Sequence, residues 1–284
     1  MPGAAPLGAQ ESGVPVQAGV LYLLPTPLGD GDDPLRILPA ATIERVSHVD
    51  YVIAEHARSA RAVLARLPMR LPLQAIEIRE LNRHTPADAL PELLAPIVAG
   101  RDAALVSEAG CPAVADPGAA VVALAHARGL RVVPLVGPSS IILALMASGM
   151  NGQRFAFAGY VPVAPGERSE RLRELERRSA RDQETQLLIE TPYRNQALFD
   201  ALLAVLSPDT LLSIATDLTL PGETIGMRSV TAWRARPPVL PKAPTVFALL
   251  ALREQAAAAP RERAPGRSPP RGGKPGRTAR GKQR

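Results

Sequence analysis

The sequence predicts an α/β fold made of two α/β domains. Short apolar runs alternate along the chain with longer segments in which apolar residues recur at helical spacing. Four of these runs are followed by loops rich in Gly, Pro or small residues. Such alternation is typical of a mostly parallel sheet covered by helices, and ligands bind such sheets where the strands end.

The first half of the chain contains four apolar runs that we expect to be strands, over residues 20–24, 49–54, 103–106 and 132–136. The intervening segments have helical periodicity, and we expect helices over residues 35–46, 59–67, 87–98 and 118–127. Gly129 stands just past the last of these helices, where a glycine commonly ends a helix.

A second series of elements follows, with strands expected over residues 155–160, 186–189, 211–215 and 245–250 and helices over 168–178 and 196–206. Residues 168–178 mix Arg with Glu, which favours a solvated helix with i,i+4 pairs over an RNA-binding stripe. We expect an N-terminal domain over residues 19–137 and a C-terminal domain over 138–256. A flexible leader over 1–18 and a disordered basic tail over 257–284 would flank them.

Composition limits the possible classes of function. The last 24 residues, 261–284, hold nine basic residues and one acidic residue, so their net charge is +8. Because the whole chain has a net charge of +6, the remaining residues sum to about −2. Such a tail is typical of a segment attracted to polyanions, although a purely solubilising role is equally open. The aromatic content of 3% argues against a binder that stacks many bases.

The single cysteine, Cys111, permits neither an internal disulfide nor a cysteine-based metal site. The four histidines are scattered without ligand spacing, so we expect no metal. No apolar run reaches the length of a membrane span, and residues 1–18 do not resemble a signal peptide. We therefore expect a cytoplasmic protein without a membrane partner.

Four loops that follow expected strands are candidates for a binding site: residues 25–30, 107–112, 137–140 and 217–219. They contain neither a P-loop nor a G-x-G-x-x-G fingerprint. Their small residues allow backbone groups to approach a ligand closely. Ser139 and Ser140 stand where a helix begins, so they could cap that helix, donate to a ligand carboxylate, or do both.

Several of these segments, taken together, resemble the tetrapyrrole methylase superfamily and, more narrowly, the ribosomal RNA small-subunit methyltransferase I family. The segments that carry the resemblance are 21–29 (LYLLPTPLG), 105–118 (LVSEAGCPAVADPG), 132–140 (VVPLVGPSS), 190–194 (ETPYR) and 217–223 (DLTLPGE). The likeness runs in order from about residue 20 to residue 250.

The resemblance implies a two-domain methyltransferase, usually a homodimer, with S-adenosylmethionine (SAM) bound between the domains. Carried over position by position, the cofactor pocket would include Leu28, Gly110, Cys111, Val114, Ser139, Ser140, Ile189, Leu218 and Ala243. Cys111 is expected to line the pocket rather than to act as a nucleophile, since no base is recognisable beside it. The acceptor would be a ribose hydroxyl of small-subunit ribosomal RNA, and the basic tail over residues 261–284 fits such a partner.

Two segments depart from the family pattern. Residues 55–58 read Glu-His-Ala-Arg where the family usually reads Glu-Asp-Thr-Arg, and residues 81–85 keep only His84 of two usual histidines. Because a ribose hydroxyl is a weak nucleophile, we expect Glu55 or His84 to act as a base. Arg58 and Arg194 would bind RNA phosphate or orient the carboxylates of Glu55 and Glu190.

Other interpretations remain open. Glu55 with Arg58, and Glu190 with Arg194, could be structural ion pairs, and His84 could be a surface residue. The chain could instead methylate a small molecule related to a tetrapyrrole precursor, or bind SAM or RNA without catalysis.

Overall fold

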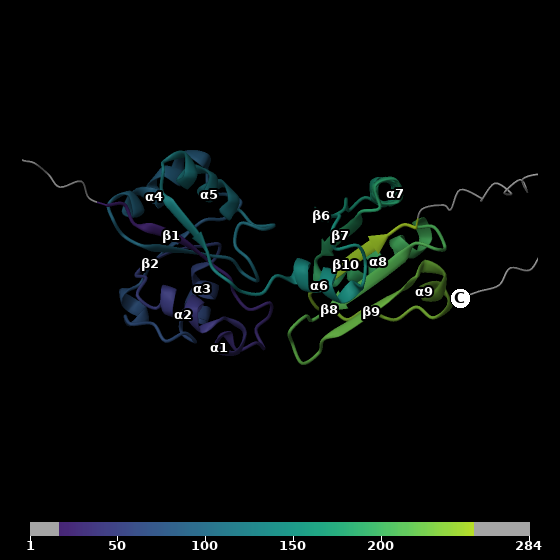
Figure 1. The fold of residues 1–284 in the computed structure, drawn as a ribbon, viewed down its shortest axis with the longest axis horizontal. Helices are drawn as coiled ribbons and strands as arrows, with labels where there is room; N and C mark the ends of the chain where they lie inside the picture. Colours follow the sequence, from purple (N-terminus) through teal and green to yellow (C-terminus); the bar gives the residue numbers. More distant parts are fainter. Residues whose placement is uncertain (1–16, 253–284) are drawn as a thin grey trace, which may run out of the picture. The chain divides into compact units, whose positions relative to one another are not determined.

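Residues 17–252 are described by a computed structural model (Figure 1). The expected leader lies almost entirely outside these residues, and the expected basic tail lies entirely outside them. Residues 17–252 lie in one unit that holds two β-sheets, so the proposed domain division at residues 137/138 stays a prediction.

The first sheet consists of five parallel strands in the order β3-β2-β4-β1-β5. Their bounds are β1 (Val20–Leu24), β2 (Tyr51–Ala54), β3 (Glu77–Glu80), β4 (Ala103–Val106) and β5 (Arg131–Pro134). The expected parallel sheet is confirmed. Strand β3 was not expected, because its sequence EIRE carries a single apolar residue.

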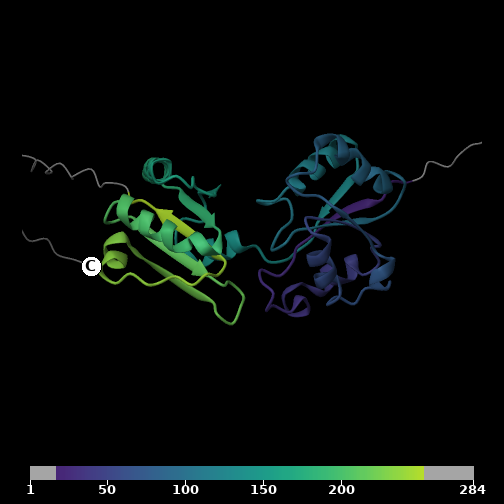
Figure 2. The ribbon, with the colours of Figure 1, turned by 180° about the vertical axis from the view of Figure 1, so that it is seen from behind.

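Helices cover both faces of this sheet (Figures 1 and 2). One face packs against α2 (Ala40–Val46) and α3 (Ala57–Leu64), and the other against α4 (Leu90–Val98) and α5 (Gly118–Ala127). Successive strand residues point to opposite faces, and strands β2 and β4 are buried along their whole length. This explains why these strands appear as continuous apolar runs.

The prediction of a single helix over residues 35–46 is wrong in one respect, because two helices occupy this segment. Helix α1 (Pro34–Ile37) ends at Leu38, whose backbone is extended, and α2 begins after Pro39. Proline disfavours the helical conformation in the residue before it and has no amide hydrogen to donate. A similar break precedes α4, where a 3-10 turn, η2 (Ala87–Ala89), leads into the helix.

The second sheet has five strands in the order β6-β7-β10-β8-β9, and only the β6–β7 pair is parallel. The strands are β6 (Phe155–Gly159), β7 (Thr185–Glu190), β8 (Leu211–Thr216), β9 (Thr224–Ser229) and β10 (Thr245–Leu250). Strand β9 lies at the edge of the sheet and alternates polar with apolar residues that are mostly exposed. It is not a continuous apolar run, so the sequence pattern did not predict it.

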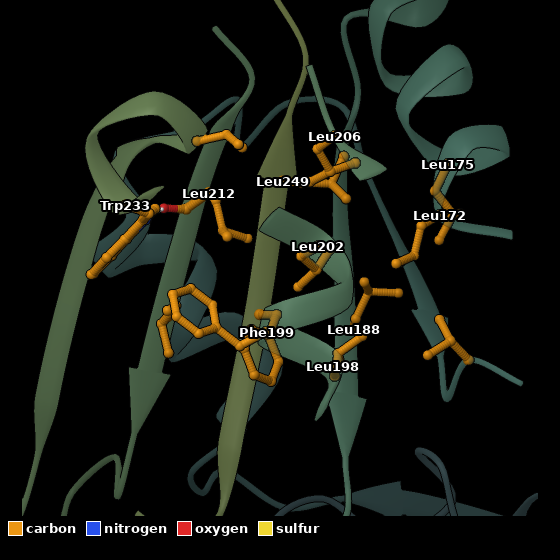
Figure 3. Close-up of a cluster of buried hydrophobic side chains, with 14 residues drawn as sticks. Leu172, Leu175, Leu188, Leu198, Phe199, Leu202, Leu206, Leu212, Trp233 and Leu249 are labelled. Carbon is orange, nitrogen blue, oxygen red and sulfur yellow. Dashed lines mark hydrogen bonds between the residues drawn. The ribbon is translucent and has the colours of Figure 1, made fainter. Parts of the chain in front are cut away.

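Three helices pack on one face of the second sheet: α7 (Pro165–Asp182), α8 (Asn195–Val205) and α9 (Val230–Ala235). Figure 3 shows their core, in which Phe199 of α8 meets Trp233 of α9 edge to face at 5.8 Å between ring centres. The indole Nε1 of Trp233 donates to the carbonyl oxygen of Leu212 at 2.9 Å. The opposite face packs against α6 (Ser140–Ser148).

Helix α7 carries ion pairs between Arg171 and Glu174 and between Arg181 and Asp182, with most of its surface in solvent. These pairs accord with the expectation of a solvated helix. Within residues 17–252, no helix is both long and apolar enough to cross a membrane.

Candidate functional site

A cavity of about 420 Å³ lies where strands of both sheets end. Its walls come from the segments after β1, β2, β4, β6, β7 and β8, from the start of α6 and from the start of β10. Cavities of this size are typical of small-molecule and cofactor sites. The position agrees with the rule that α/β sheets bind ligands at the carboxyl ends of their strands.

The loop after β4 is held in an unusual backbone conformation. Gly110 has φ +75°, and the non-glycine residues Ala113 and Ala115 have φ +65° and +61°. The backbone of Gly110 exchanges two hydrogen bonds with that of Thr26, at 2.9 and 3.1 Å. These bonds fix the loop to the segment after β1. Left-handed backbone in residues other than glycine is costly and gathers at functional sites.

Asp116 stabilises the same loop from inside. Its Oδ1 accepts hydrogen bonds from the amides of Ala113 at 2.8 Å and Gly118 at 2.7 Å. Burial raises the pKa of the Asp116 carboxyl, although the two amide hydrogen bonds act in the opposite direction. The carboxyl therefore holds the turn that leads into α5.

Ser139 is the N-cap of α6, and its hydroxyl accepts from the amide of Ile142 at 3.5 Å. Beside it, the Cys111 thiol donates to the carbonyl oxygen of Pro138 at 3.4 Å. Burial raises the pKa of the Cys111 thiol, and a hydrogen bond with Ser139 opposes this in part. A protonated thiol is a poor nucleophile, which agrees with a role as a small lining residue.

The segment after β8 touches the segment after β1. The Thr219 hydroxyl donates to the buried carboxylate of Asp32, and the side chain of Leu220 packs against Gly29. A Cβ atom at Gly29 would lie 2.6 Å from Leu220 Cδ1, so the leucine side chain would have to move to make room for it. Leu28 and Leu218, each beside one of these contacts, line the cavity.

Glu190 ends β7 at the cavity, and its side chain is only 1% exposed. Its Oε1 accepts from the amide of Thr191 at 2.8 Å. The guanidinium of Arg194 lies 2.8 Å from Glu190 Oε2, an ion-pair distance. The pair does not form a hydrogen bond, so the buried atoms Glu190 Oε2 and Arg194 Nη2 have no hydrogen-bond partner within residues 17–252. The structural ion pair considered from the sequence is therefore present.

Tyr160 follows the last residue of β6 and also lines the cavity. Although most of the residue is exposed, partial desolvation raises the pKa of its phenol, and the negative charges of Glu190 and Glu55 add to the effect. The phenol therefore stays neutral and can donate a hydrogen bond.

The cavity walls include all but one of the expected cofactor residues: Leu28, Gly110, Cys111, Val114, Ser139, Ser140, Ile189 and Leu218. Ala243 is not a wall residue, whereas its neighbour Pro244 is. The carbonyl oxygen of Ala243 instead accepts from Asn195 Nδ2 at 2.7 Å.

The five expected catalytic residues divide into two groups. Glu55 and Glu190 line the cavity, whereas Arg58, His84 and Arg194 do not. Arg58 lies exposed in the first turn of α3, and no ion pair joins it to Glu55 within residues 17–252. His84 is exposed in the segment after β3, where its Nε2 lies 3.1 Å from Arg83 Nε. In the described part of the chain, no three His, Cys, Asp or Glu side chains are placed to hold a metal ion.

Some wall residues were not proposed individually as site residues from the sequence, among them Tyr160, Asp116, Thr191, Asp217 and Thr245. Asp116 and Asp217 stand in segments whose likeness to the family was noted, so their motifs could have identified them. Tyr160 and Thr245 carry no such signal. They reach the cavity because β6 and β10 are neighbours of β7 in the sheet.

Comparisons with known proteins agree with this architecture. The family model described as Tetrapyrrole (Corrin/Porphyrin) Methylases matches residues 20–231. A protein of Mesorhizobium japonicum named Ribosomal RNA small subunit methyltransferase I is 36% identical over 70% of this chain and 63% of its own length. A protein of the same name from Xylella fastidiosa is 32% identical over 73% of this chain and 71% of its own length.

Among solved structures, the methyltransferase CobJ covers 83% of this chain and 100% of its own, with a TM-score of 0.54 and 16% identity. This likeness shows a shared fold. The chain spans somewhat less than two thirds of the Mesorhizobium relative and slightly more than two thirds of the Xylella relative. On the family match and these identities, the chain belongs to the tetrapyrrole (corrin/porphyrin) methylase family and is a methyltransferase.

Proposed function

We propose that the chain binds SAM in this cavity and transfers its methyl group to a ribose 2′-hydroxyl of small-subunit ribosomal RNA. The observation that carries the proposal is the cavity itself, whose walls hold eight of the positions that the family likeness assigns to the cofactor. The names of relatives at 30–36% identity support RNA as the acceptor.

The residues that line the cavity suit SAM in their chemistry. Gly110 brings bare backbone to the wall, and a Cβ atom there would lie 3.2 Å from Leu28 Cδ2. Leu28, Ile189 and Leu218 offer an apolar surface to an adenine ring. The hydroxyls of Ser139 and Ser140 and the amides at the start of α6 offer donors to a carboxylate. These residues would therefore hold the cofactor largely through backbone and apolar contacts.

Bound SAM supplies a methyl group on a positively charged sulfur, which is open to in-line attack by a nucleophile. The protein must hold the acceptor hydroxyl in line with that group, and positioning of this kind can provide much of the acceleration. Glu55 is the carboxylate that we assign to the proton of the hydroxyl. It lines the cavity and has no hydrogen bond or ion pair from its side chain within residues 17–252. Glu190 is already engaged by Thr191 and Arg194.

Arg58 and His84 lie outside the cavity wall but follow β2 and β3, adjacent parallel strands that end at the same edge of the sheet. We assign them to RNA phosphates rather than to proton transfer. Arg194 orients Glu190. The tail over residues 261–284 adds sequence-independent attraction to RNA. A cytoplasmic homodimer completes the proposal.

The first test is a calorimetric titration of the full chain with S-adenosylhomocysteine. We expect micromolar binding that is weakened at least tenfold by Gly110→Val, since a branched side chain is strained at φ +75° and its Cβ would lie 3.2 Å from Leu28 Cδ2. Binding that is absent at millimolar ligand, or unaffected by the substitution, would contradict this assignment of the cofactor site.

The second test concerns the base. Glu55→Gln keeps the size of the side chain and removes its ability to take a proton, so we expect turnover to fall by about 10²–10⁴-fold with unchanged affinity for S-adenosylhomocysteine. Glu92→Gln, on the exposed side of α4, is the matched control. Full turnover in Glu55→Gln would exclude Glu55 as the base.

The family description also names corrins and porphyrins, which makes methylation of a small molecule the second candidate. Removal of residues 261–284 separates the two. For an RNA substrate, we expect the truncated protein to bind ribosomal RNA more weakly and with a shallower dependence on salt. Methylation of a tetrapyrrole precursor that is unaffected by the truncation, with no methylation of RNA, would favour the second candidate.

A further inference from the structure

The nine aromatic side chains of this chain are unevenly placed. Most are buried in the two cores, and the two most exposed are Tyr193 at 72% and Tyr160 at 58%. The next, Phe155, is 39% exposed. An exposed ring leaves apolar surface in water, so the positions of these tyrosines call for an explanation.

Both tyrosines lie at the end of the second sheet where strands β6 and β7 have their carboxyl ends. Tyr160 follows β6, and Tyr193 belongs to η3 (Pro192–Arg194), the 3-10 turn after β7. The two strands are parallel neighbours, with Gly159 opposite Leu188, so their carboxyl ends coincide. The cavity lies at this same end of the sheet, because Tyr160, Glu190 and Pro192 are among its wall residues. Phe155 stands at the opposite end of β6.

The proposed reaction has a requirement that the cofactor cavity does not meet. A ribose hydroxyl can reach a reaction centre only if its nucleotide is held there, much as enzymes that modify a base hold that base outside the stack. Proteins replace the lost stacking with aromatic side chains, and RNA-binding proteins rely on this contact for unpaired bases.

We propose that Tyr160 and Tyr193 form the contact surface for the base of the acceptor nucleotide and its neighbour, an inference that rests on the proposed function. Two rings suffice for one or two bases, so the low aromatic content, which argues against an extended stacking surface, is no obstacle. The neutral phenol of Tyr160 also offers a donor to a base edge or to the ribose, close to Glu55 and Glu190. Tyr193 is not a wall residue of the cavity, so it is the cleaner of the two to test.

The experiment measures binding of a fluorescein-labelled ten-nucleotide single-stranded RNA by anisotropy, with the full chain saturated by S-adenosylhomocysteine. Tyr193→Leu and Tyr160→Leu keep apolar bulk and remove the ring face. We expect each to weaken binding by about 5- to 150-fold, the usual range for loss of one stacked base. Tyr193→Phe should bind within about threefold of the wild type, because the ring face remains.

Two controls separate stacking from general effects. Phe155→Leu removes an exposed ring at the far end of β6 and should leave RNA affinity unchanged. An oligomer of the same length that lacks bases should bind the wild type and Tyr193→Leu equally, since the phosphates are common to both. Affinity of Tyr193→Leu for S-adenosylhomocysteine should match that of the wild type.

The inference is overturned if the leucine variants bind RNA as tightly as the wild type, if Phe155→Leu weakens binding equally, or if the wild-type protein does not bind the oligomer. Methyl transfer to small ribosomal subunits by the wild-type protein is measured in parallel. Transfer that persists in the tyrosine variants with an unchanged KM refutes the stacking surface alone. Absence of transfer in the wild type refutes the proposed function itself.

Discussion

The hydrogen bond between Thr219 and Asp32 ties the segment after β8 to the segment after β1. Asp32 is buried, and the hydroxyl of Thr219 is the donor to its carboxylate within residues 17–252. Thr219→Val replaces this hydroxyl with a methyl group of similar size. A hydrogen bond to a charged group contributes about 1.5–3 kcal/mol, so we expect the free energy of unfolding to fall by about 2 kcal/mol.

A double-mutant cycle measures this interaction directly. Asp32→Ala, Thr219→Val and the double variant are each unfolded with urea, with and without S-adenosylhomocysteine. Because Leu28 and Leu218 line the cavity beside this contact, we also expect each variant to bind the ligand more weakly. The double variant should be little worse than either single variant, with a coupling energy above about 1 kcal/mol. Thr219→Ser keeps the hydroxyl and serves as the control.

The reasoning is refuted if the two substitutions are additive within about 0.5 kcal/mol, the limit for independent sites. It is also refuted if Thr219→Ser is as unstable as Thr219→Val, because the hydroxyl would then contribute nothing.

Three further predictions concern the cores and the buried ion pair. Burial raises the pKa of Tyr51 from 10.0 to about 12, so its stabilising contribution is complete below pH 10 and is lost as pH rises to 12. Tyr51→Phe should remove about 3 kcal/mol of this pH dependence in urea titrations, and an unchanged dependence would contradict the prediction. Phe199→Ala empties a fully buried site beside Trp233 and should cost about 3–5 kcal/mol, measured by Trp fluorescence during unfolding; a loss under 1 kcal/mol would argue against this packing. Glu190→Gln leaves the guanidinium of Arg194 without its counter-charge and should lower the free energy of unfolding by about 1–3 kcal/mol. This loss is smaller than for a fully buried pair because Arg194 is partly exposed. Adding Arg194→Gln to Glu190→Gln should not lower the free energy of unfolding by a second loss of the same size.

Strands β2 and β4 of the first sheet were predictable because they are buried on both faces and therefore appear as continuous apolar runs. Strand β3 was not, since Glu77 and Arg79 lie outside the core and pair with each other. The break between α1 and α2 was visible in Pro39, but apolar periodicity continues across it. Periodicity reports which face is buried and is insensitive to a local interruption of the backbone.

The residues of the candidate site likewise fall into those that the sequence could predict and those that it could not. Wall residues such as Gly110 and Ser139 stand in motifs with strong family likeness, and their placement follows from the strand that precedes each of them. Tyr160 and Pro244 belong to no such motif. They reach the cavity through the strand order of the second sheet, which places β6 and β10 on either side of β7. That order depends on long-range pairing, which local sequence patterns do not specify.

The central claim is methyl transfer from SAM to a ribose hydroxyl of small-subunit ribosomal RNA. The most direct measurement incubates the full chain with SAM carrying a deuterated methyl group and with small ribosomal subunits that lack the modification, followed by mass spectrometry of the nucleosides. The account predicts a single deuterated 2′-O-methyl nucleoside that is strongly reduced with Glu55→Gln. Label found on a base, or no label in RNA while a tetrapyrrole precursor is methylated, would contradict it.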